Sequence, residues 1–375
     1  MIRTTLHRGS GQVVHIRELS KRLLRKGFNI TVFTFKEDED ISPVEVETVK
    51  FKGSNIPFIR NFGFTAKCGM LIKSFDLIHT QYHPAIITGN LVHALRGLPH
   101  IFTFHGYAPI RSWRNPAQKL KMLDHTLGTL FALRSGVTRV IAVSHYLKRV
   151  LMKRYRFDES RISVIHNGVD LEMFKPRMDV DNLRERYGIS DSPSVLYLGR
   201  MDPYKGVEYL LRAAHIVVEH IPKVKFIIAG GSRFDRSNVQ DYLTSSKIRR
   251  STIFTGYLPR SEIPLLYSAC EVFCYPSMWE GFGLTPAEAQ ASAKPVVAFN
   301  HCAIPEVVKH GETGILVNPG DYKKLADAIV RLLSDPDLRR RMGEEGRRRV
   351  EKLFNWDEAA DKTIEVYRQV AESRR

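Results

Sequence analysis

The segment YPSMWEGFGLTPAEAQASA, residues 275–293, decides the architecture of the chain around it. It continues the apolar run VFCY of residues 272–275, which stops at Pro276 and is followed by a turn containing Gly281 and Gly283. Beyond the turn the residues change to a helical pattern. The segment therefore predicts a buried strand, a glycine turn and a helix in that order.

The helix is predicted to begin with Thr285 as its N-cap. Pro286 suits the first helical position because no N–H is needed there, and Glu288 completes a capping box. The free N–H groups and partial positive charge of such a helix start favour a phosphate. Glu280 and Glu288 flank this anion site, where carboxylates can hydrogen-bond sugar hydroxyls. The alternative is that Glu288 only caps the helix and that Glu280 is a solvated loop residue.

The composition predicts a cytosolic globular protein with two domains. A chain of 375 residues exceeds one ordinary core, and its hydrophobic and charged fractions, 43% and 26%, are those of globular proteins. No apolar run has the length of a membrane span, and the N-terminal segment lacks a signal-peptide pattern. The four cysteines show no CxxC pair and are expected to be reduced and mostly buried: Cys68, Cys270, Cys274 and Cys302.

The net charge of +17 is unevenly distributed. Residues 1–175 hold 27 Lys and Arg against 13 Asp and Glu, a difference of +14, which leaves +3 for the remainder. Such a positive field attracts anionic membranes, nucleic acid or phosphorylated substrates. A nucleic-acid module would carry a recognisable motif, and the sequence has none.

Strand and helix patterns alternate in both halves of the chain, which predicts two parallel sheets with helices on both faces. In the first half, an amphipathic helix with a basic outer face is predicted after Gly9 and Gly11. The predicted strands of this half are 2–6, 29–35, 76–80, 100–105, 139–143 and 161–165. Those of the second half are 195–199, 226–230, 252–256, 271–275, 296–299 and 314–317.

The polar stretch 174–194 loses the alternation and predicts a domain boundary. We expect a first Rossmann-like domain at 1–175 and a second at 176–355, with the closing helix 356–375 packing back on the first. Ligands of open α/β sheets bind at the carboxyl ends of the strands. The two sheets are therefore predicted to border an interdomain cleft.

Three groups of residues can bind an anion or polarise a substrate. Arg200 follows Gly199 at the end of a predicted strand, and Lys205 comes five residues later, so the two cations can clamp a diphosphate. An ordinary solvated turn is the competing interpretation. His105 ends another strand and can donate to a substrate oxygen, although a lone histidine is more often structural. Gly11 opens a helix whose backbone offers a second phosphate site.

Together these features resemble the retaining glycosyltransferases of GT-B fold in glycosyltransferase family 4, also called glycosyl transferases group 1. GSGQVVHIRELSKRLLRKGFNITVFTF resembles the family's glycine loop, first helix and second strand. VIHNGVDLEMFKP is similar to its VIPNGVD-type segment, and LYLGRMDPYKGVEYLL to its donor-phosphate clamp. The longest match is FTGYLPRSEIPLLYSACEVFCYPSMWEGFGLTPAEAQASAKPVVAF, which includes a Glu-x7-Glu motif.

The resemblance implies a role for each candidate site residue. Arg200 and Lys205 would hold the donor diphosphate, and Glu280 would lie against the donor sugar. Glu288 would bind the nucleotide ribose, and His105 would contact the sugar near the reacting carbon. The remaining donor-binding positions are Gly11, Gly199, Gly283, Leu284 and Thr285, the last three through backbone groups.

The resemblance also implies transfer with retention of anomeric configuration and without a cofactor, the donor being a UDP- or GDP-sugar. The leaving phosphate itself would accept the acceptor proton. Asp179 and Asp181 spell Asp-x-Asp, a metal-diphosphate motif, but they lie in the polar stretch with no strand before them, so metal-independent transfer is predicted. His166 in place of a proline, and GGSRFDRSN at 230–238 in place of a glycine-rich motif, leave the nucleotide base open.

The acceptor is expected to bind the first domain, because the donor motifs lie in the second. Two basic clusters in the first domain favour a lipid-linked or phosphate-bearing acceptor at an anionic membrane surface. These clusters are Arg17, Lys21, Arg22, Arg25 and Lys26, then Lys148, Arg149, Lys153 and Arg154. The predicted protein is cytoplasmic, at the inner face of the cell membrane. The alternatives are a GT-B-like epimerase or phosphorylase, and a non-enzymatic basic protein that binds membrane or nucleic acid.

Overall fold

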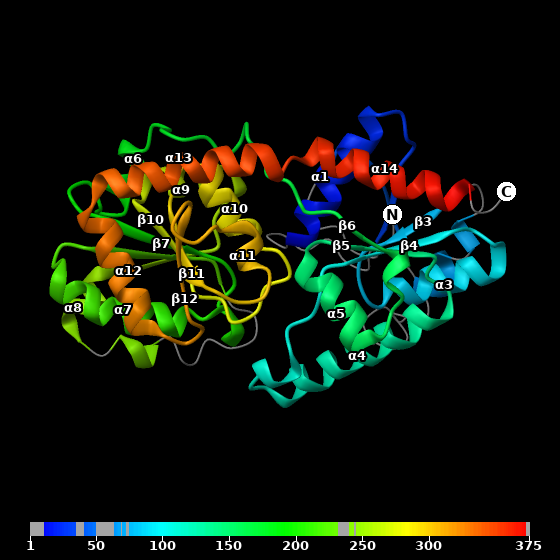
Figure 1. Cartoon of the computed structure of the whole chain (residues 1–375), viewed down its shortest axis with the longest axis horizontal. Helices are drawn as coiled ribbons and strands as arrows, with labels where there is room; N and C mark the ends of the chain where they lie inside the picture. The colour runs from blue at the N-terminus through cyan, green and yellow to red at the C-terminus, as the bar shows by residue number, and fades with distance from the viewer. Residues whose placement is uncertain are drawn as a thin grey trace. The chain divides into compact units, whose positions relative to one another are not determined.

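The computed structural model describes residues 11–34, 41–49, 64–68, 70–72, 75–231, 240–243 and 245–372. The chain divides into two compact units, shown with their elements in Figure 1. Unit 1 comprises residues 1–107, 119–167 and 356–375, and unit 2 comprises residues 108–118 and 168–355. None of the described helices is long and apolar enough to cross a membrane.

Unit 1 is built on parallel strands. Four of them form a sheet in chain order: β3 (Ile78–Thr80), β4 (His100–Phe104), β5 (Arg139–Ala142) and β6 (Ile162–Val164). Of these, β3 and β4 are fully buried. A further parallel pair is β1 (Thr31–Thr34) with β2 (Glu45–Thr48). Five predicted strands are confirmed, and the one predicted at 2–6 lies outside the described residues. The sequence analysis missed β2 because its residues EVET are exposed or half-buried and contain no apolar run.

The helices of unit 1 are α1 (Gly11–Arg25), α3 (Ala85–Arg96), α4 (Pro116–Ser135), α5 (His145–Tyr155) and α14 (Trp356–Glu372). The first residues of α4 belong to unit 2. We did not predict α4, because it carries leucines on its exposed side as well as apolar residues on its buried side, which removes the helical period. The C-terminal helix α14 packs on α1, where Lys26 and Asp361 form an ion pair at 2.7 Å.

The predicted basic outer face of α1 is wrong for two of its arginines. Arg17 is 5% exposed, and its Nε lies 2.9 Å from a carboxylate oxygen of Glu18. Arg22 pairs with the other oxygen of Glu18 at 2.9 Å and lies 3.5 Å from Asp357 on α14. The helix therefore meets acidic groups of its own unit on the side that the sequence predicts to be an open cationic surface.

Unit 2 contains a six-stranded parallel sheet. The strands are β7 (Ser194–Leu198), β8 (Lys225–Ala229), β9 (Thr252–Gly256), β10 (Val272–Tyr275), β11 (Val296–Phe299) and β12 (Gly314–Val317). Their order is β12-β11-β10-β7-β8-β9. Each predicted strand of the second half is confirmed, because buried apolar runs such as those of β10 and β11 are a strong sequence signal, although the edge strand β9 is half-buried.

The helices of unit 2 flank this sheet, with α7 and α12 packed together and α10 packed on α13 (Figure 1). Their bounds are α6 (Asp181–Arg186), α7 (Val207–His220), α8 (Ser246–Ser251), α9 (Ile263–Ala269), α10 (Leu284–Ala291), α11 (Ile304–Val307), α12 (Tyr322–Ser334) and α13 (Pro336–Leu353). This unit also contains the short 3-10 helices η1 (Ile110–Ser112), η3 (Pro203–Lys205), η4 (Gln240–Tyr242) and η5 (Arg260–Glu262), whereas η2 (Glu159–Arg161) belongs to unit 1. The stretch that the sequence predicts to be irregular contains α6.

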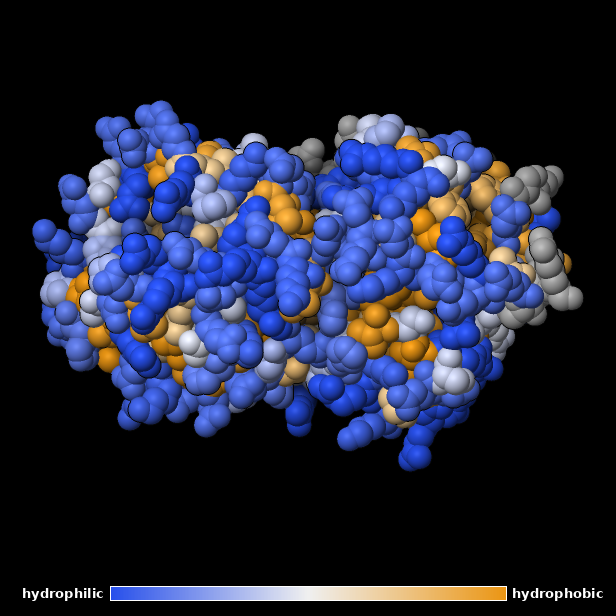
Figure 2. Space-filling view, turned by 45° about the horizontal axis from the view of Figure 1, so that its top comes forward, coloured by the Kyte–Doolittle hydropathy of each residue, from blue (hydrophilic) through white to orange (hydrophobic). Residues whose placement is uncertain are grey.

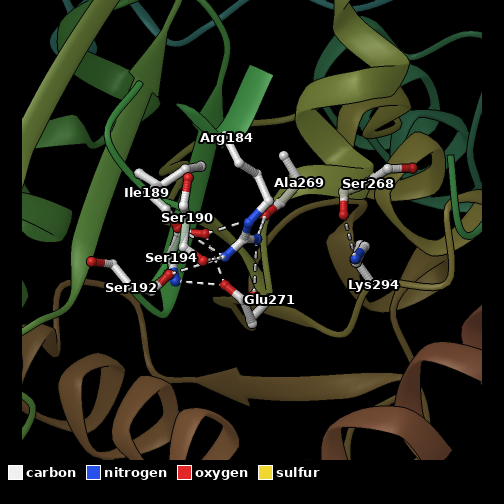
Figure 3. A network of polar contacts seen from close by, with 9 residues as sticks. All are labelled: Arg184, Ile189, Ser190, Ser192, Ser194, Ser268, Ala269, Glu271 and Lys294. Carbon is white, nitrogen blue, oxygen red and sulfur yellow. Dashed lines mark hydrogen bonds and ion pairs between the residues drawn. The ribbon is translucent and has the colours of Figure 1, made fainter. Parts of the chain in front are cut away.

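A polar network joins the amino ends of β7 and β10 in the middle of this sheet (Figure 3). The guanidinium of Arg184 donates to the carbonyls of Ala269 and Ile189, the latter at 2.9 Å, and lies 3.3 Å from Glu271. Glu271 accepts from the N–H and the hydroxyl of Ser194 at 2.6 and 2.8 Å. The network thus fixes the strand ends opposite to those where ligands of such sheets bind.

Candidate active site

The turn after β10 enters α10 earlier than the sequence predicts. The N-cap is Gly283, whose φ of 111° is available to glycine, and no side chain caps the helix. Thr285 is therefore not the N-cap but the second helical residue, and Pro286 is the third. Glu288 does not form a capping box; its carboxylate accepts from the hydroxyl of Tyr267 at 3.1 Å. The sequence analysis missed this because a positive φ at Gly283 leaves no pattern beyond the glycine itself.

The start of α10 leaves backbone donors free. Pro286 has no N–H, and the N–H of Ala287 already donates to the carbonyl of Gly283 at 3.2 Å. The N–H groups of Leu284 and Thr285 donate to no group in the part of the chain that the structure describes. Two neighbouring donors at a helix start form an anion site of the kind that binds phosphate.

A lysine, a glutamate and a tyrosine meet at the carboxyl end of β10. Lys205 Nζ lies 2.6 Å from Glu280 Oε2 and donates to the Tyr275 hydroxyl at 2.8 Å. That hydroxyl in turn donates to the same oxygen, Glu280 Oε2, at 2.7 Å. Burial, and next the charge of Glu280, hold the pKa of the Tyr275 phenol well above its ordinary value. The phenol therefore stays protonated and serves as a hydrogen-bond donor to the carboxylate.

The β7–α7 connection reaches this cluster because two loops lie in contact. Gly206 follows Lys205 with φ 72°, and a Cβ there would lie 1.9 Å from the carbonyl oxygen of Pro276. The N–H of Met278 donates to the carbonyl of Tyr204 at 2.8 Å. Only glycine permits this approach, which places the ammonium of Lys205 over the end of β10.

Arg200 extends from the same connection and is more exposed than Lys205. Its Nη1 lies 3.0 Å from Oδ2 of the buried Asp202, and its Nη2 donates to the Tyr204 hydroxyl. The ring of Tyr204 is 5.9 Å from the Arg200 guanidinium carbon and 5.4 Å from Lys205 Nζ. The two cations therefore share one aromatic ring, which fixes their spacing.

His105 and Gly11 belong to unit 1. His105 Nε2 lies 3.0 Å from Gln81 Oε1, and Gln81 Nε2 lies 3.1 Å from His79 Nε2. Burial holds the pKa of His79 well below its ordinary value, so its Nε2 can accept from the Gln81 amide. The Gln81 oxygen then accepts from His105 Nε2–H. Gly11 is the first residue of α1, and His15 on the same helix contacts the His105 ring at a centroid distance of 4.8 Å.

The structure brings most of the predicted donor residues together at the carboxyl ends of β7 and β10, all in unit 2. Sequence analysis missed the groups that hold them, namely Tyr275, Asp202, Tyr267 and, in unit 1, Gln81. Tyr275 carries the one signal that could have been used, a hydroxyl at the last position of a buried strand next to the glutamate turn. The nucleotide-base segment 232–239 lies outside the described residues.

The Asp-x-Asp sequence lies apart from any strand end. Asp179 and Asp181 are both exposed and precede or begin α6. The N–H of Asp181 donates to the carboxylate of Asp179 at 3.3 Å. The Asp179 carboxylate thus accepts from the backbone at the start of a short helix.

Comparisons with known proteins match most of the length of the sequence. A family model described as Glycosyltransferase Family 4 matches residues 9–173, and one described as Glycosyl transferases group 1 matches residues 179–349. The chain is 30% identical to an alpha-maltose-1-phosphate synthase of Mycolicibacterium smegmatis over 96% of each chain. It is 29% identical, over 84% of this chain and 81% of the other, to the Escherichia coli UDP-Gal:alpha-D-GlcNAc-diphosphoundecaprenol alpha-1,3-galactosyltransferase.

A solved structure is also similar to this chain over most of its length. The sucrose-phosphate synthase of Thermosynechococcus elongatus superposes with a TM-score of 0.83 at 27% identity. The match covers 97% of this chain and 94% of that one.

Proposed function

Because this chain belongs to the glycosyltransferases of family 4 and group 1, with two Rossmann-like domains of the GT-B fold, we propose that it is a retaining hexosyltransferase. Its donor is a nucleotide-sugar, UDP- or GDP-linked, and its acceptor is a lipid-linked or otherwise phosphate-bearing glycan. The predicted site residues keep the roles that the sequence suggests for them.

The proposal rests on the hydrogen bonding of the Glu280 carboxylate. Both of its hydrogen bonds, from Lys205 and from Tyr275, end on Oε2. Among the described residues nothing donates to Oε1, so that oxygen keeps its lone pairs for a ligand. A carboxylate that is held rigidly through one oxygen and open at the other is suited to accept from sugar hydroxyls.

The groups around Glu280 supply the other contacts of a nucleotide-sugar. Arg200 and Lys205 neutralise the diphosphate, and the N–H groups of Leu284 and Thr285 donate to one of its phosphates. Glu288, oriented by the Tyr267 hydroxyl, accepts from the ribose. Gly199 and Gly283 keep the backbone free of side chains along this path.

His105 acts from unit 1. Its Nε2–H is directed to Gln81, which holds the ring in one orientation. We assign this ring to the sugar near the reacting carbon, with Gly11 offering backbone contact at the start of α1. Gln81 is a positioning residue in this account.

The chemistry needs no enzymatic base in this mechanism. As the bond between the anomeric carbon and the diphosphate breaks, the acceptor hydroxyl attacks the face that the diphosphate leaves, and a leaving phosphate oxygen takes the hydroxyl proton. Arg200 and Lys205 stabilise the charge that develops on the diphosphate, the largest catalytic effect available to such a site. These two cations take the role of a divalent metal, so transfer is metal-independent.

An exposed apolar stripe on two helices of unit 1 supports an acceptor at a membrane. On α4, Leu120 and Phe131 are 68% and 67% exposed, and on α3 Leu95 is 69% exposed. Lys119, Lys121 and Arg134 are exposed on α4 as well. The face of the molecule shown in Figure 2 is largely hydrophilic, with several apolar patches. Leucines flanked by basic residues suit insertion into an anionic interface.

This docking surface replaces the cluster predicted on α1, since Arg17 and Arg22 are occupied by Glu18. We expect the chain to sediment with anionic liposomes and to be released by salt. The variant Leu120→Ser/Phe131→Ser should lose this binding, whereas Leu353→Ser, which alters a leucine of α13 that is 40% exposed, should keep it. Sedimentation that is unaffected by lipid charge or by the double substitution would favour a soluble acceptor.

The experiment that tests the function is a screen of UDP-, GDP- and ADP-hexoses for binding and for slow hydrolysis in the absence of acceptor. We expect one nucleotide class to bind and to be hydrolysed. NMR of the first product formed should show the anomeric configuration of the donor. Inversion of that configuration would overturn the retaining mechanism, and failure to bind any nucleotide-sugar would overturn the function.

A further inference from the structure

Two histidines and an aspartate meet in unit 1, and none of the three has been assigned a role above. They are His83, in the segment between β3 and α3, and Asp124 and His125 on α4. Each offers one ligand atom, and the three atoms all lie within 4.8 Å of one another. The two imidazole rings are 5.1 Å apart between centroids and tilted by 45°.

The His83 ring is buried with one nitrogen unsatisfied. The residue is 4% exposed, and its Nδ1 has no hydrogen-bond partner. That nitrogen lies 3.9 Å from Asp124 Oδ2, too far for a hydrogen bond. A Cβ at position 128 would lie 2.1 Å from His83 Nε2, so Gly128 leaves the space that lets the ring pack against α4. Because an unsatisfied buried polar atom is costly, a partner for Nδ1 is expected.

The His125 ring is prepared for the same partner. Its Nδ1 lies 3.0 Å from the Tyr82 hydroxyl, which leaves Nε2 as the other ring nitrogen. Metal-ligating histidines usually make such a contact through the nitrogen that does not bind the metal.

We propose that His83, Asp124 and His125 bind a divalent transition metal of the zinc type, which joins the segment after β3 to α4. Two imidazole nitrogens and one carboxylate oxygen form a ligand set that zinc accepts and that magnesium and calcium do not prefer. The side chain of Asp124 is 67% exposed, so it is free to move closer to a bound metal. The site does not rest on the proposed glycosyl transfer.

The test is a titration of the metal-stripped full chain, without a histidine tag, with Co²⁺ followed by Zn²⁺ competition. We expect visible Co²⁺ absorption that saturates at one ion per chain and is displaced by Zn²⁺. Asp124→Asn should weaken metal binding by at least about tenfold, which is the smallest loss typical when a group that orients a metal ligand is changed. His220→Gln removes an exposed histidine of α7 and serves as the matched control, with binding unchanged.

Thermal unfolding gives a second readout that does not depend on spectroscopy. Zn²⁺ should raise the Tm of the wild-type chain by mass action, and the increase should be lost in Asp124→Asn. Because Asp124 is exposed, this substitution should leave the fold intact. Equal Co²⁺ binding by wild type, Asp124→Asn and His125→Gln would overturn the proposal. So would a Tm that falls in Asp124→Asn but is unaffected by Zn²⁺ in the wild type, since that result indicates an ion pair only.

Discussion

The two ends of the unit 2 sheet each pair a cation with a glutamate beside β10, but the partners of these charges differ. At the amino end, Glu271 is 3.3 Å from Arg184, and its other oxygen accepts twice from Ser194 (Figure 3). At the carboxyl end, Glu280 is 2.6 Å from Lys205, and its bonds all end on one oxygen.

This difference separates a charge pair that supports the fold from one that supports chemistry. The guanidinium of Arg184 donates to backbone carbonyls, which need hydrogen-bond partners in the folded protein. The N–H groups of Arg184 are therefore used within the protein itself. The Lys205 ammonium donates to side chains alone among the described residues, and Glu280 retains an oxygen for a ligand. A glutamate whose oxygens already accept hydrogen bonds from the fold is structural. A glutamate with an oxygen that lacks a donor, at the end of the sheet where ligands bind, is a candidate for function.

The largest expected effect is that of Lys205→Ala, which removes one of the two cations proposed to bind the diphosphate and a close partner of Glu280. Turnover of the donor should fall by at least about 100-fold, the scale for losing one preorganised electrostatic contact. Lys294→Ala is the matched control, because Lys294 donates to the Ser268 carbonyl at 3.0 Å and should not affect turnover. Steady-state rates with circular dichroism as a check on folding decide this. Comparable rates for the two variants would show that the Lys205–Glu280 pair has no special role in catalysis.

A smaller loss is expected for Tyr275→Phe. The substitution keeps the buried ring and removes one hydrogen bond to the Glu280 carboxylate, a contact worth about 1.5–3 kcal/mol. Turnover should fall about tenfold or more, with little change in the KM of the donor. A raised KM with unchanged kcat would mean that Tyr275 helps to bind the substrate rather than to hold Glu280 for the reaction.

At the amino end we expect stability rather than rate to respond. Arg184→Lys keeps the charge but cannot reach all the carbonyls that the guanidinium reaches, at a cost of about 2 kcal/mol. The Tm should fall by roughly 4–8 °C in a domain of this size. Turnover measured well below the Tm should remain normal. An activity loss as large as that of Lys205→Ala would show that both ends of the sheet serve catalysis.

The smallest expected effect is that of a chelator on transfer. EDTA should leave kcat unchanged, because Arg200 and Lys205 supply the positive charge at the diphosphate. Any zinc removed from the His83 site should appear as a lower Tm. Loss of activity in EDTA with recovery on Mg²⁺ or Mn²⁺ would show that the leaving group depends on a metal.

The strands of both units and most donor residues could be predicted because each has a local signal, a buried apolar run or a charge at the end of one. What could not be predicted depends on distant contacts. The Lys205–Tyr275 bond joins residues 70 positions apart, and Arg22 of α1 lies 3.5 Å from Asp357 on the C-terminal helix α14. The start of α10 was missed for a local reason, since a glycine that turns the chain at positive φ resembles any other glycine.

The central claim, that Glu280 serves the reaction while Glu271 serves the fold, is tested most directly by one paired measurement. Glu280→Gln and Glu271→Gln make the same chemical change at opposite ends of β10, and each variant is assayed for kcat and Tm. Glu280→Gln should lose at least about 100-fold in kcat and keep its Tm within about 2–4 °C, the shift that 1 kcal/mol produces. Glu271→Gln should show a normal kcat and a clearly lower Tm. Near-normal turnover of Glu280→Gln, or the same loss in both variants, would contradict the account.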